Sequence, residues 1–466
     1  MNDTSMPQGD DASALLESLW QQVGGDADAL SNIAIEGAPV LPTSFRVADM
    51  ASATIAATGL SATGIHQMRG GESQQIRVDT RHAEIAYLSE RYLEVEGDWP
   101  DHQSPTWGYY RTKDDRWVQV HTTFPHHQAG AAALLQVEPT RSQFAAAIAN
   151  WSGVELEDTF ANHGLPCTLM RSRPEWLAHP QGAAVAELPL MDFEKIGDAP
   201  AGALGPSERP MSGINVLDLT RVIAGPVAGR TMAEHGANVL RIASPNLPFV
   251  PRLVIDSGRG KRSAHIDLNA STDRTQFEQL IDGADIMVQG YRPGAIGGLG
   301  YTPHEVAKMR PGIVYVSLCA FSHAGPWAGR RGFDSLVQIA SGIAKAGSDE
   351  AGRADPVPLP CQALDHATGY LAALGAMMGL QRQWREGGSW HVRVSLAQTA
   401  EWLARLGRIE RRVEASPARE TISDLMDACD SPFGRTEFIK PVAQLSATPG
   451  FWATPAVPLG THPPTW

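Results

Sequence analysis

The sequence predicts an α/β protein with two kinds of domain, a large one built on a parallel sheet and a smaller α+β one. Three observations carry this prediction. Short apolar runs alternate with helix-like segments between residues 212 and 320, which is the order of strands and helices in βαβ units. Residues 107–121 fall outside this alternation and have the pattern of a β-hairpin. The length of 466 residues is enough for about two to three domains.

The alternating region can be followed element by element. Strands are expected at the apolar runs 214–219, 238–242, 285–289 and 312–318. Helices are expected between them, at 224–235, 277–281 and 303–309. Parallel strands joined in this way bind their ligands at the carboxyl ends of the strands. The loops that follow the four strands are therefore where a ligand site is expected.

A unit of helix, glycine pair, strand and helix occurs twice in the chain. In the later copy, Asp365 opens a helix rich in Ala and Gly, and the following strand ends at Val394. In the earlier copy, Asp49 opens a similar helix, and the following strand ends at Val78. The aspartate and the valine are 29 positions apart in both copies. We interpret this agreement as an internal repeat.

The composition excludes several classes of function. The chain has 38 Lys and Arg against 51 Asp and Glu, a net charge of −13, so neither a nucleic acid nor a membrane surface is expected as a partner. Four scattered cysteines without a CxxC pair argue against zinc and disulfides and favour a reducing cytoplasm. His126 and His127 are adjacent but have no third ligand at a useful spacing, so no metal is expected.

Basic residues gather at the predicted strand ends, although the chain as a whole is acidic. The loop 252–262 contains one acid, Asp256, and four basic residues, which are Arg252, Arg259, Lys261 and Arg262. Further basic residues at the strand ends are Arg241, Arg292, Arg330 and Arg331. The cluster predicts a polyphosphate ligand, with Tyr291 stacked on a purine or covering a pantetheine arm. A solvated run of charges and a half-buried edge aromatic are the plainer alternatives.

Asp365 is the candidate residue for chemistry. It stands at the start of an otherwise apolar helix, where the helix dipole stabilises a carboxylate as an anion. A carboxylate exposed to a pocket at that place can serve as a nucleophile or a base. A simple helix cap is the alternative, and spacing alone does not choose between them.

Taken in order, the motifs of the second half resemble those of the family III CoA-transferases. They include Leu217-Asp-Leu-Thr-Arg-Val-Ile-Ala-Gly-Pro226, Gly236-Ala-Asn-Val-Leu-Arg-Ile242, Arg259-Gly-Lys-Arg-Ser263, Tyr291-Arg-Pro-Gly294, Gly332-Phe-Asp334 and Asp365-His-Ala-Thr-Gly369. Each motif is weak alone, but the ordered set, spread over about 212–400, is specific. The resemblance implies a Rossmann-like large domain, a smaller domain and interlocked dimers in which each chain threads the other.

The resemblance also implies a reaction and its residues. The substrates would be an acyl-CoA and a carboxylic acid acceptor, with no tightly bound cofactor. The carboxylate of Asp365 would attack the thioester, giving an acyl-aspartyl anhydride and a CoA thiolate. Asp334 and Gln338 fall near the active-site wall. The positions that match the family's CoA-contacting surfaces are Val222, Ile223, Arg241, Arg259, Lys261, Tyr291, Arg292 and Arg331.

The order of the parts departs from the family's usual order. We divide the chain into a partial, helix-rich copy of the large domain (12–100), a small α+β domain (101–195), a linker (196–211), a CoA-binding large domain with Asp365 (212–411) and a C-terminal tail (412–466). This order is that of a rearranged fusion of two incomplete copies that complement each other, either as a homodimer or as a pseudo-dimeric monomer. Asp49 has no basic loop before it and is expected to be a relic.

Two other functions are weighed against CoA transfer. A 2-methylacyl-CoA racemase shares the implied fold but carries a histidine where this chain has Phe333, and a phenyl ring cannot exchange a proton. A non-catalytic acyl-CoA-binding protein would keep the basic loop but would not need Asp365.

Overall fold

The computed structural model describes residues 12–98, 104–202, 205–410 and 413–466. Its largest unit is a seven-stranded sheet in the order β10-β9-β8-β11-β12-β13-β7. The strands are β7 (Asp192–Gly197), β8 (Asn215–Leu219), β9 (Asn238–Ala243), β10 (Lys261–His265), β11 (Ile286–Gln289), β12 (Val314–Cys319) and β13 (Ser389–Ser395). All neighbours are parallel except β7, which runs antiparallel to β13. The α/β class and the four strands predicted after residue 212 are thus confirmed.

Alternate residues of the strands enter two separate cores, one on each face of the sheet. The helices of this part are α10 (Ala224–Glu234), α11 (Pro251–Gly258), α12 (Ser271–Asp282), α13 (Pro303–Met309), α14 (Asp334–Ala340), α15 (Ile343–Ala351), α16 (Ala363–Glu386) and α17 (Leu396–Arg405), with a 3-10 turn η2 (Gly297–Leu299). Val216 and Val288 pack toward α10 and α16. Leu217 and Met287 pack toward α12 and α13. This period of two is what a sheet covered on both faces requires.

One expectation about this domain is wrong. The sequence predicts a basic loop over 252–262, but most of that stretch is regular. Helix α11 extends to Gly258, and β10 begins at Lys261 and pairs with β9. Only Arg259 and Gly260 connect the two elements. Most of the basic residues are therefore part of a helix or of the edge strand β10 and do not lie on an open loop.

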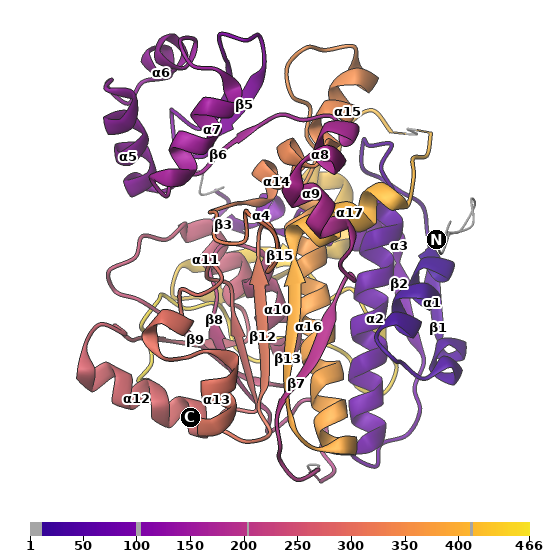
Figure 1. Ribbon diagram of the computed structural model, residues 1–466. Coiled ribbons are helices and arrows are strands. Elements are labelled where there is room, and N and C mark those ends of the chain that lie inside the picture. Colours follow the sequence, from indigo (N-terminus) through magenta and orange to yellow (C-terminus); the bar gives the residue numbers. More distant parts are fainter. Residues whose placement is uncertain (1–11, 99–103, 203–204, 411–412) are drawn as a thin grey trace.

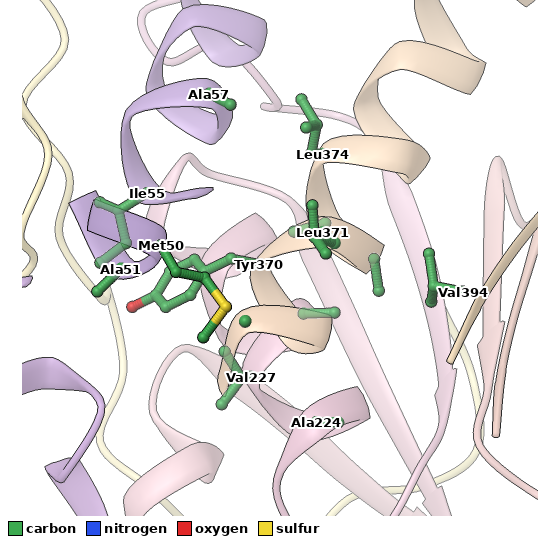
Figure 2. Close-up of a cluster of buried hydrophobic side chains, with 14 of the residues drawn as sticks. Met50, Ala51, Ile55, Ala57, Ala224, Val227, Tyr370, Leu371, Leu374 and Val394 are labelled. Carbon is green, nitrogen blue, oxygen red and sulfur yellow. The ribbon is translucent and has the colours of Figure 1, made fainter. Parts of the chain in front are cut away.

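The first part of the chain contributes a second helical layer. Its elements are α1 (Ala12–Gln22), η1 (Ala27–Asn32), β1 (Ile33–Glu36), α2 (Val47–Met68), β2 (Ile76–Asp79), α3 (Thr80–Ala86), α4 (Ser89–Tyr92) and β3 (Glu94–Val95). Helix α2 lies alongside α16 (Figure 1). Met50 and Ile55 of α2 belong to the same buried cluster as Leu371 of α16 and Val227 of α10 (Figure 2). Almost every residue of α2 is buried, because the helix lies between other elements on all sides.

The internal repeat predicted from the sequence is present in the structure. Helices α2 and α16 start from residues with nearly the same backbone angles, φ −76° and ψ 50° at Arg46, and φ −80° and ψ 60° at Gln362. Asp49 and Asp365 are each the third residue of their helix. The two aspartates therefore occupy equivalent backbone positions.

The equivalence continues through the strands that follow the two helices. Strand β2 has β1 as its parallel neighbour and β16 (Gln444–Leu445) as its antiparallel one. Strand β13 has β12 and β7 in the same two roles. The side chains of Asp79 and Ser395, which end β2 and β13, each cap the next helix. The earlier copy thus reproduces one edge of the large sheet but lacks its other strands.

The small domain lies at one end of the molecule (Figure 1). It contains β4 (Gly108–Arg111), β5 (Trp117–Val120) and β6 (Cys167–Leu169), with α5 (Pro125–Leu135), α6 (Arg141–Ile148) and α7 (Gly153–Asn162). The hairpin predicted at 107–121 is formed by β4 and β5. The domain has its own apolar core, which includes Tyr110, Phe144 and Phe160. Helices α8 (Arg173–Ala178) and α9 (Pro180–Ala186) then lead back to the large sheet.

The last part of the chain ties the two copies together. After η3 (Arg419–Leu425), strands β14 (Met426–Ser431) and β15 (Gly434–Ile439) form a hairpin that pairs with β3. Beyond β16 the chain runs along the large domain, where Gly260 N donates to Thr454 O at 2.8 Å and Trp466 Nε1 donates to Leu280 O at 2.8 Å. None of the helices in the described ranges has the length and apolar character that a bilayer-spanning segment needs.

Candidate active site

Asp365 lies in the first turn of α16 and faces a cavity of about 350 Å³. The side chain is 7% exposed. Leu219 at the end of β8, Gly290 after β11 and Cys319 at the end of β12 form one wall of this cavity. The site is thus at the carboxyl ends of parallel strands, where such sheets bind their ligands.

A chain of hydrogen bonds holds the start of α16 in place. The backbone N–H of Asp365 donates to Asp334 Oδ2 at 2.8 Å. The amide of Gln338 donates to the other oxygen of Asp334, and Gln338 Oε1 accepts from the backbone N–H of Leu359 at 2.8 Å. Asp334 and Gln338, expected near the active-site wall, are therefore placed directly behind the aspartate.

Burial controls the ionisation of both aspartates. It raises the pKa of Asp365 well above its usual range, and the negative charges of Asp334 and Glu90 raise that pKa further. Burial also raises the pKa of Asp334 to about 6, against hydrogen bonds from the Asp365 N–H and from Gln338. A carboxyl group with a pKa this far above the ordinary value is a recurring feature of catalytic sites.

The first copy reaches this site through α4. Glu90 Oε2 and His366 Nε2 are 3.0 Å apart, and both side chains are buried. The ring of Tyr87 stacks on His366 at 5.4 Å. Burial alone would raise the pKa of Glu90, but the hydrogen bond with His366 and the positive charges of His366 and Arg91 together lower it. The sequence contains no local signal for Glu90, since its partner is 276 positions away.

The residues matched to CoA contacts fall into three groups. Val222, Tyr291, Arg292 and Arg331 line the Asp365 cavity. Arg241 lines an adjoining cavity of about 40 Å³, to which Val222 also belongs. Ile223 is buried before α10 and lines neither cavity.

Val222 is held in a strained backbone conformation. Its φ of +71° is unusual for a branched side chain, because the Cβ substituents crowd the backbone there. Such strain persists where the surroundings enforce it and is concentrated at functional sites. The strain turns the loop after β8 so that Val222 is shared by both cavities.

Arg259 and Lys261 belong with Ile223 to the third group, which lines neither cavity. Lys261 Nζ is 2.8 Å from Asp218 Oδ2 and donates to Pro226 O at 2.7 Å. Arg259 pairs with Asp256 at 3.2 Å. Both basic side chains are at most 2% exposed, and burial lowers the pKa of Lys261 to about 7. Their charges are used to pair buried aspartates, so the open positive surface predicted from the sequence is not formed by these two residues.

Several cavity residues have no counterpart in the sequence analysis of the site. Arg221 lines both cavities, and its guanidinium lies 5.0 Å from the ring of Phe124. It stands inside the motif at 217–226, so the signal for it was present. Phe124, His126 and His127 come from the small domain. Only the folded chain brings that domain against the strand ends.

Asp49 has a different environment from its counterpart. Its carboxylate pairs with Arg46 at 3.2 Å. It lines neither of the two cavities described above. The expected status of Asp49 as a relic stays a prediction.

Comparisons with known proteins bear on the identity of the chain. The model of CoA-transferase family III matches residues 16–202 and 211–424. The chain is 30% identical over 292 residues to an acyl-CoA transferase of Gibberella moniliformis, covering 60% of this chain and 50% of that protein. It is 30% identical over 193 residues to the succinyl-CoA:glutarate CoA-transferase of Mus musculus, covering 39% of this chain and 44% of that protein.

A crystal structure of a hypothetical protein from Mycobacterium tuberculosis is 29% identical, covers 42% of this chain and 56% of that one, and has a TM-score of 0.39. The chain spans between a third and about half of the length of the curated relatives it matches first. The family match, in contrast, extends over most of this chain in two segments. On that match, the chain belongs to CoA-transferase family III.

Proposed function

We propose that the protein transfers CoA between an acyl-CoA thioester and a carboxylic acid, with Asp365 as the nucleophile. The observation that carries the proposal is the place of Asp365, at a helix start and facing a cavity lined by Arg221, Arg292 and Arg331. Arginines suit the phosphates of CoA. The names of the relatives, which include acyl-CoA and succinyl-CoA:glutarate transferases, support the same reaction class.

The proposed reaction proceeds through covalent intermediates on Asp365. A carboxylate oxygen attacks the thioester carbon, the C–S bond breaks, and a mixed anhydride and a CoA thiolate are formed. The thiolate then attacks the aspartyl carbonyl and releases the donor acid, leaving an aspartyl thioester. The acceptor acid repeats these steps in reverse, takes CoA and restores the free carboxylate. No proton or electron is gained or lost over the whole exchange.

The surroundings suit this chemistry in two ways. The start of α16 is held by Asp334, which limits the motion of the nucleophile and keeps it aligned. The helix dipole favours the anion of Asp365, while burial opposes it. A carboxylate that is both aligned and poorly solvated is a stronger nucleophile than one in water.

We further propose that the first copy replaces a second subunit. The resemblance implies interlocked dimers, and within this chain α2 packs against α16 and Glu90 of α4 contacts His366, which supports the proposal. On this view residues 12–100 support the site, 101–195 cover it, and 212–411 bind CoA. One chain would then contain one active site.

The experiment is the replacement of Asp365 by Asn, followed by measurement of CoA exchange between labelled acyl-CoA and free acid over a panel of acids. We expect a loss of at least about 1,000-fold in kcat, because a carboxamide cannot form the anhydride. Asp49→Asn is the matched control at the equivalent helix position and is expected to keep full activity. CoA exchange that survives Asp365→Asn would refute the assignment. Exchange of the C2 proton of the acyl-CoA with solvent, without transfer of CoA to the acid, would indicate a racemase instead.

A further inference from the structure

His127 is a buried imidazole without a partner inside the proposed active site. It lies in the first turn of α5 and lines the same cavity as Asp365. Its side chain is 3% exposed, and neither ring nitrogen has a hydrogen-bond partner among the described residues. The rings of Phe124 and Phe333 lie at 5.7 Å and 6.1 Å and fix its position by edge contacts. A buried polar group without a hydrogen-bond partner is unfavourable, unless a bound ligand supplies the partner.

The charges around His127 indicate what kind of ligand would form a hydrogen bond with its ring. Arg331 lines the same cavity, its Nε also lacks a partner, and it lies beside Gly164 of the small domain. Among the described residues that line the cavity, Asp365 is the only acid. Burial, together with the positive charges of His126 and Arg331, lowers the pKa of His127 to about 3. The small-domain side of the cavity therefore has an excess of hydrogen-bond donors and positive charge.

A metal ion does not explain the histidine pair. His126 and His127 are in ring contact at 4.1 Å. Within the described ranges, no group of three or more His, Cys, Asp or Glu is arranged to hold a metal. The basic Arg331 would also repel a cation.

We propose that His127 and Arg331 bind a second carboxylate on the acyl chain, so that the enzyme prefers dicarboxylic acids. This inference rests on the proposed CoA transfer at Asp365. The guanidinium of Arg331 would pair with the anion, and the neutral imidazole of His127 would donate its one N–H. One carboxyl group of the substrate then reacts at Asp365 while the other is held at the small domain. Arg331 would serve the acid in this arrangement, and Arg221 and Arg292 would remain for CoA.

The test uses two acceptors, glutarate and pentanoate, which differ by one terminal carboxylate. The full-length protein is assayed with the donor that exchanges fastest, and kcat/KM is measured for both acids. We expect the wild type to prefer glutarate by at least about tenfold, the effect of one lost charged hydrogen bond. His127→Phe keeps an aromatic ring and should remove most of this preference, because kcat/KM falls more for glutarate than for pentanoate. His163→Phe, at an exposed histidine of the small domain, is the control and should change neither value.

Binding of both acids to the CoA-saturated protein is measured in parallel by calorimetry. Tighter binding of glutarate that depends on His127 supports the inference even where exchange is absent, in which case the proposed function fails alone. Equal kcat/KM for the two acids in the wild type, or an equal loss for both in His127→Phe, overturns the inference and leaves the proposed function standing.

Discussion

The ionisation of Asp365 depends on a residue that lies far from it in the sequence. Glu90, from the first copy, is fully buried and its charge raises the pKa of Asp365. Asp365 acts as an anion in the proposed reaction, so the rate must fall as the pH drops through that pKa. The contribution of Glu90 can therefore be measured as a shift of the acid limb of the pH profile.

Replacing Glu90 by Gln should shift that acid limb to lower pH by up to about one unit. The substitution removes a negative charge near Asp365, so its pKa falls, while the new amide oxygen still accepts from His366. The measurement is kcat/KM against pH for both proteins. Glu84→Gln is the control, since Glu84 is another buried carboxylate of the first copy that lies outside the cavity. An unchanged acid limb in Glu90→Gln would show that the charge of Glu90 does not act on the nucleophile.

For single residues, the sequence predicts the place in the fold better than the partners of the side chain. Val222, Tyr291, Arg292 and Arg331 could be placed at the cavity because their motifs follow strands, and strand ends converge in a parallel sheet. Lys261 could not be placed correctly, since its partner Asp218 stands 43 positions earlier and no local pattern connects the two. A count of charges does not show which of them are neutralised inside the fold.

Helices α10 and α16 approach closely at a glycine. A Cβ added at Gly369 would lie 2.5 Å from Ala224 O and 2.7 Å from Val227 Cβ. Backbone and a β-branched side chain cannot move aside easily, so the contact depends on the absence of a side chain. The aspartate of α16 is thereby held near the start of α10, which follows the strained Val222.

Gly369→Ala should lower the free energy of unfolding by about 1–3 kcal/mol through overpacking. Urea unfolding of the wild type and the variant measures the difference. Gly298→Ala is the matched control, because no atom lies within 4 Å of a Cβ added there. Equal stability of Gly369→Ala and wild type would mean that the two helices are free to separate.

The repeat was predictable at the scale of elements because both copies keep the same spacing from aspartate to strand end. The pairing of β16 with β2 was not predictable. That strand is two residues long, too short for its pattern to be distinguished from a loop, and its partner lies near the other end of the chain.

In the whole molecule, the proposed arrangement gives one chain one complete set of site elements. The strands that carry the basic residues precede α16. In the described part of the chain, the sheet next to α2 contains β1, β2 and β16. We therefore expect one CoA to bind per chain, measured by calorimetry with the full-length protein. Two CoA molecules per chain would contradict a single site and would give Asp49 a function.

The parallel-sheet domain could be predicted as a whole from alternating strands and helices, but the arrangement of the two copies could not. The composition of α2 and α16, which is rich in small residues, suits helices that are buried on nearly all sides. It does not show that each is the other's partner. The two helices recognise each other through the close packing of small side chains, and a pattern along the sequence does not show which surfaces pack together.

The pairing of α2 with α16 also has a consequence for how the protein is made. Gln381 donates a hydrogen bond to Ser61, 320 positions earlier. A ribosome therefore releases α2, a helix that is almost wholly buried in the folded protein, long before the segment that covers it exists. The nascent chain must keep this helix shielded until synthesis has passed α16. Contacts of such high sequence separation slow folding, so this chain is expected to depend on holding chaperones during translation more than a protein of equal size with local contacts.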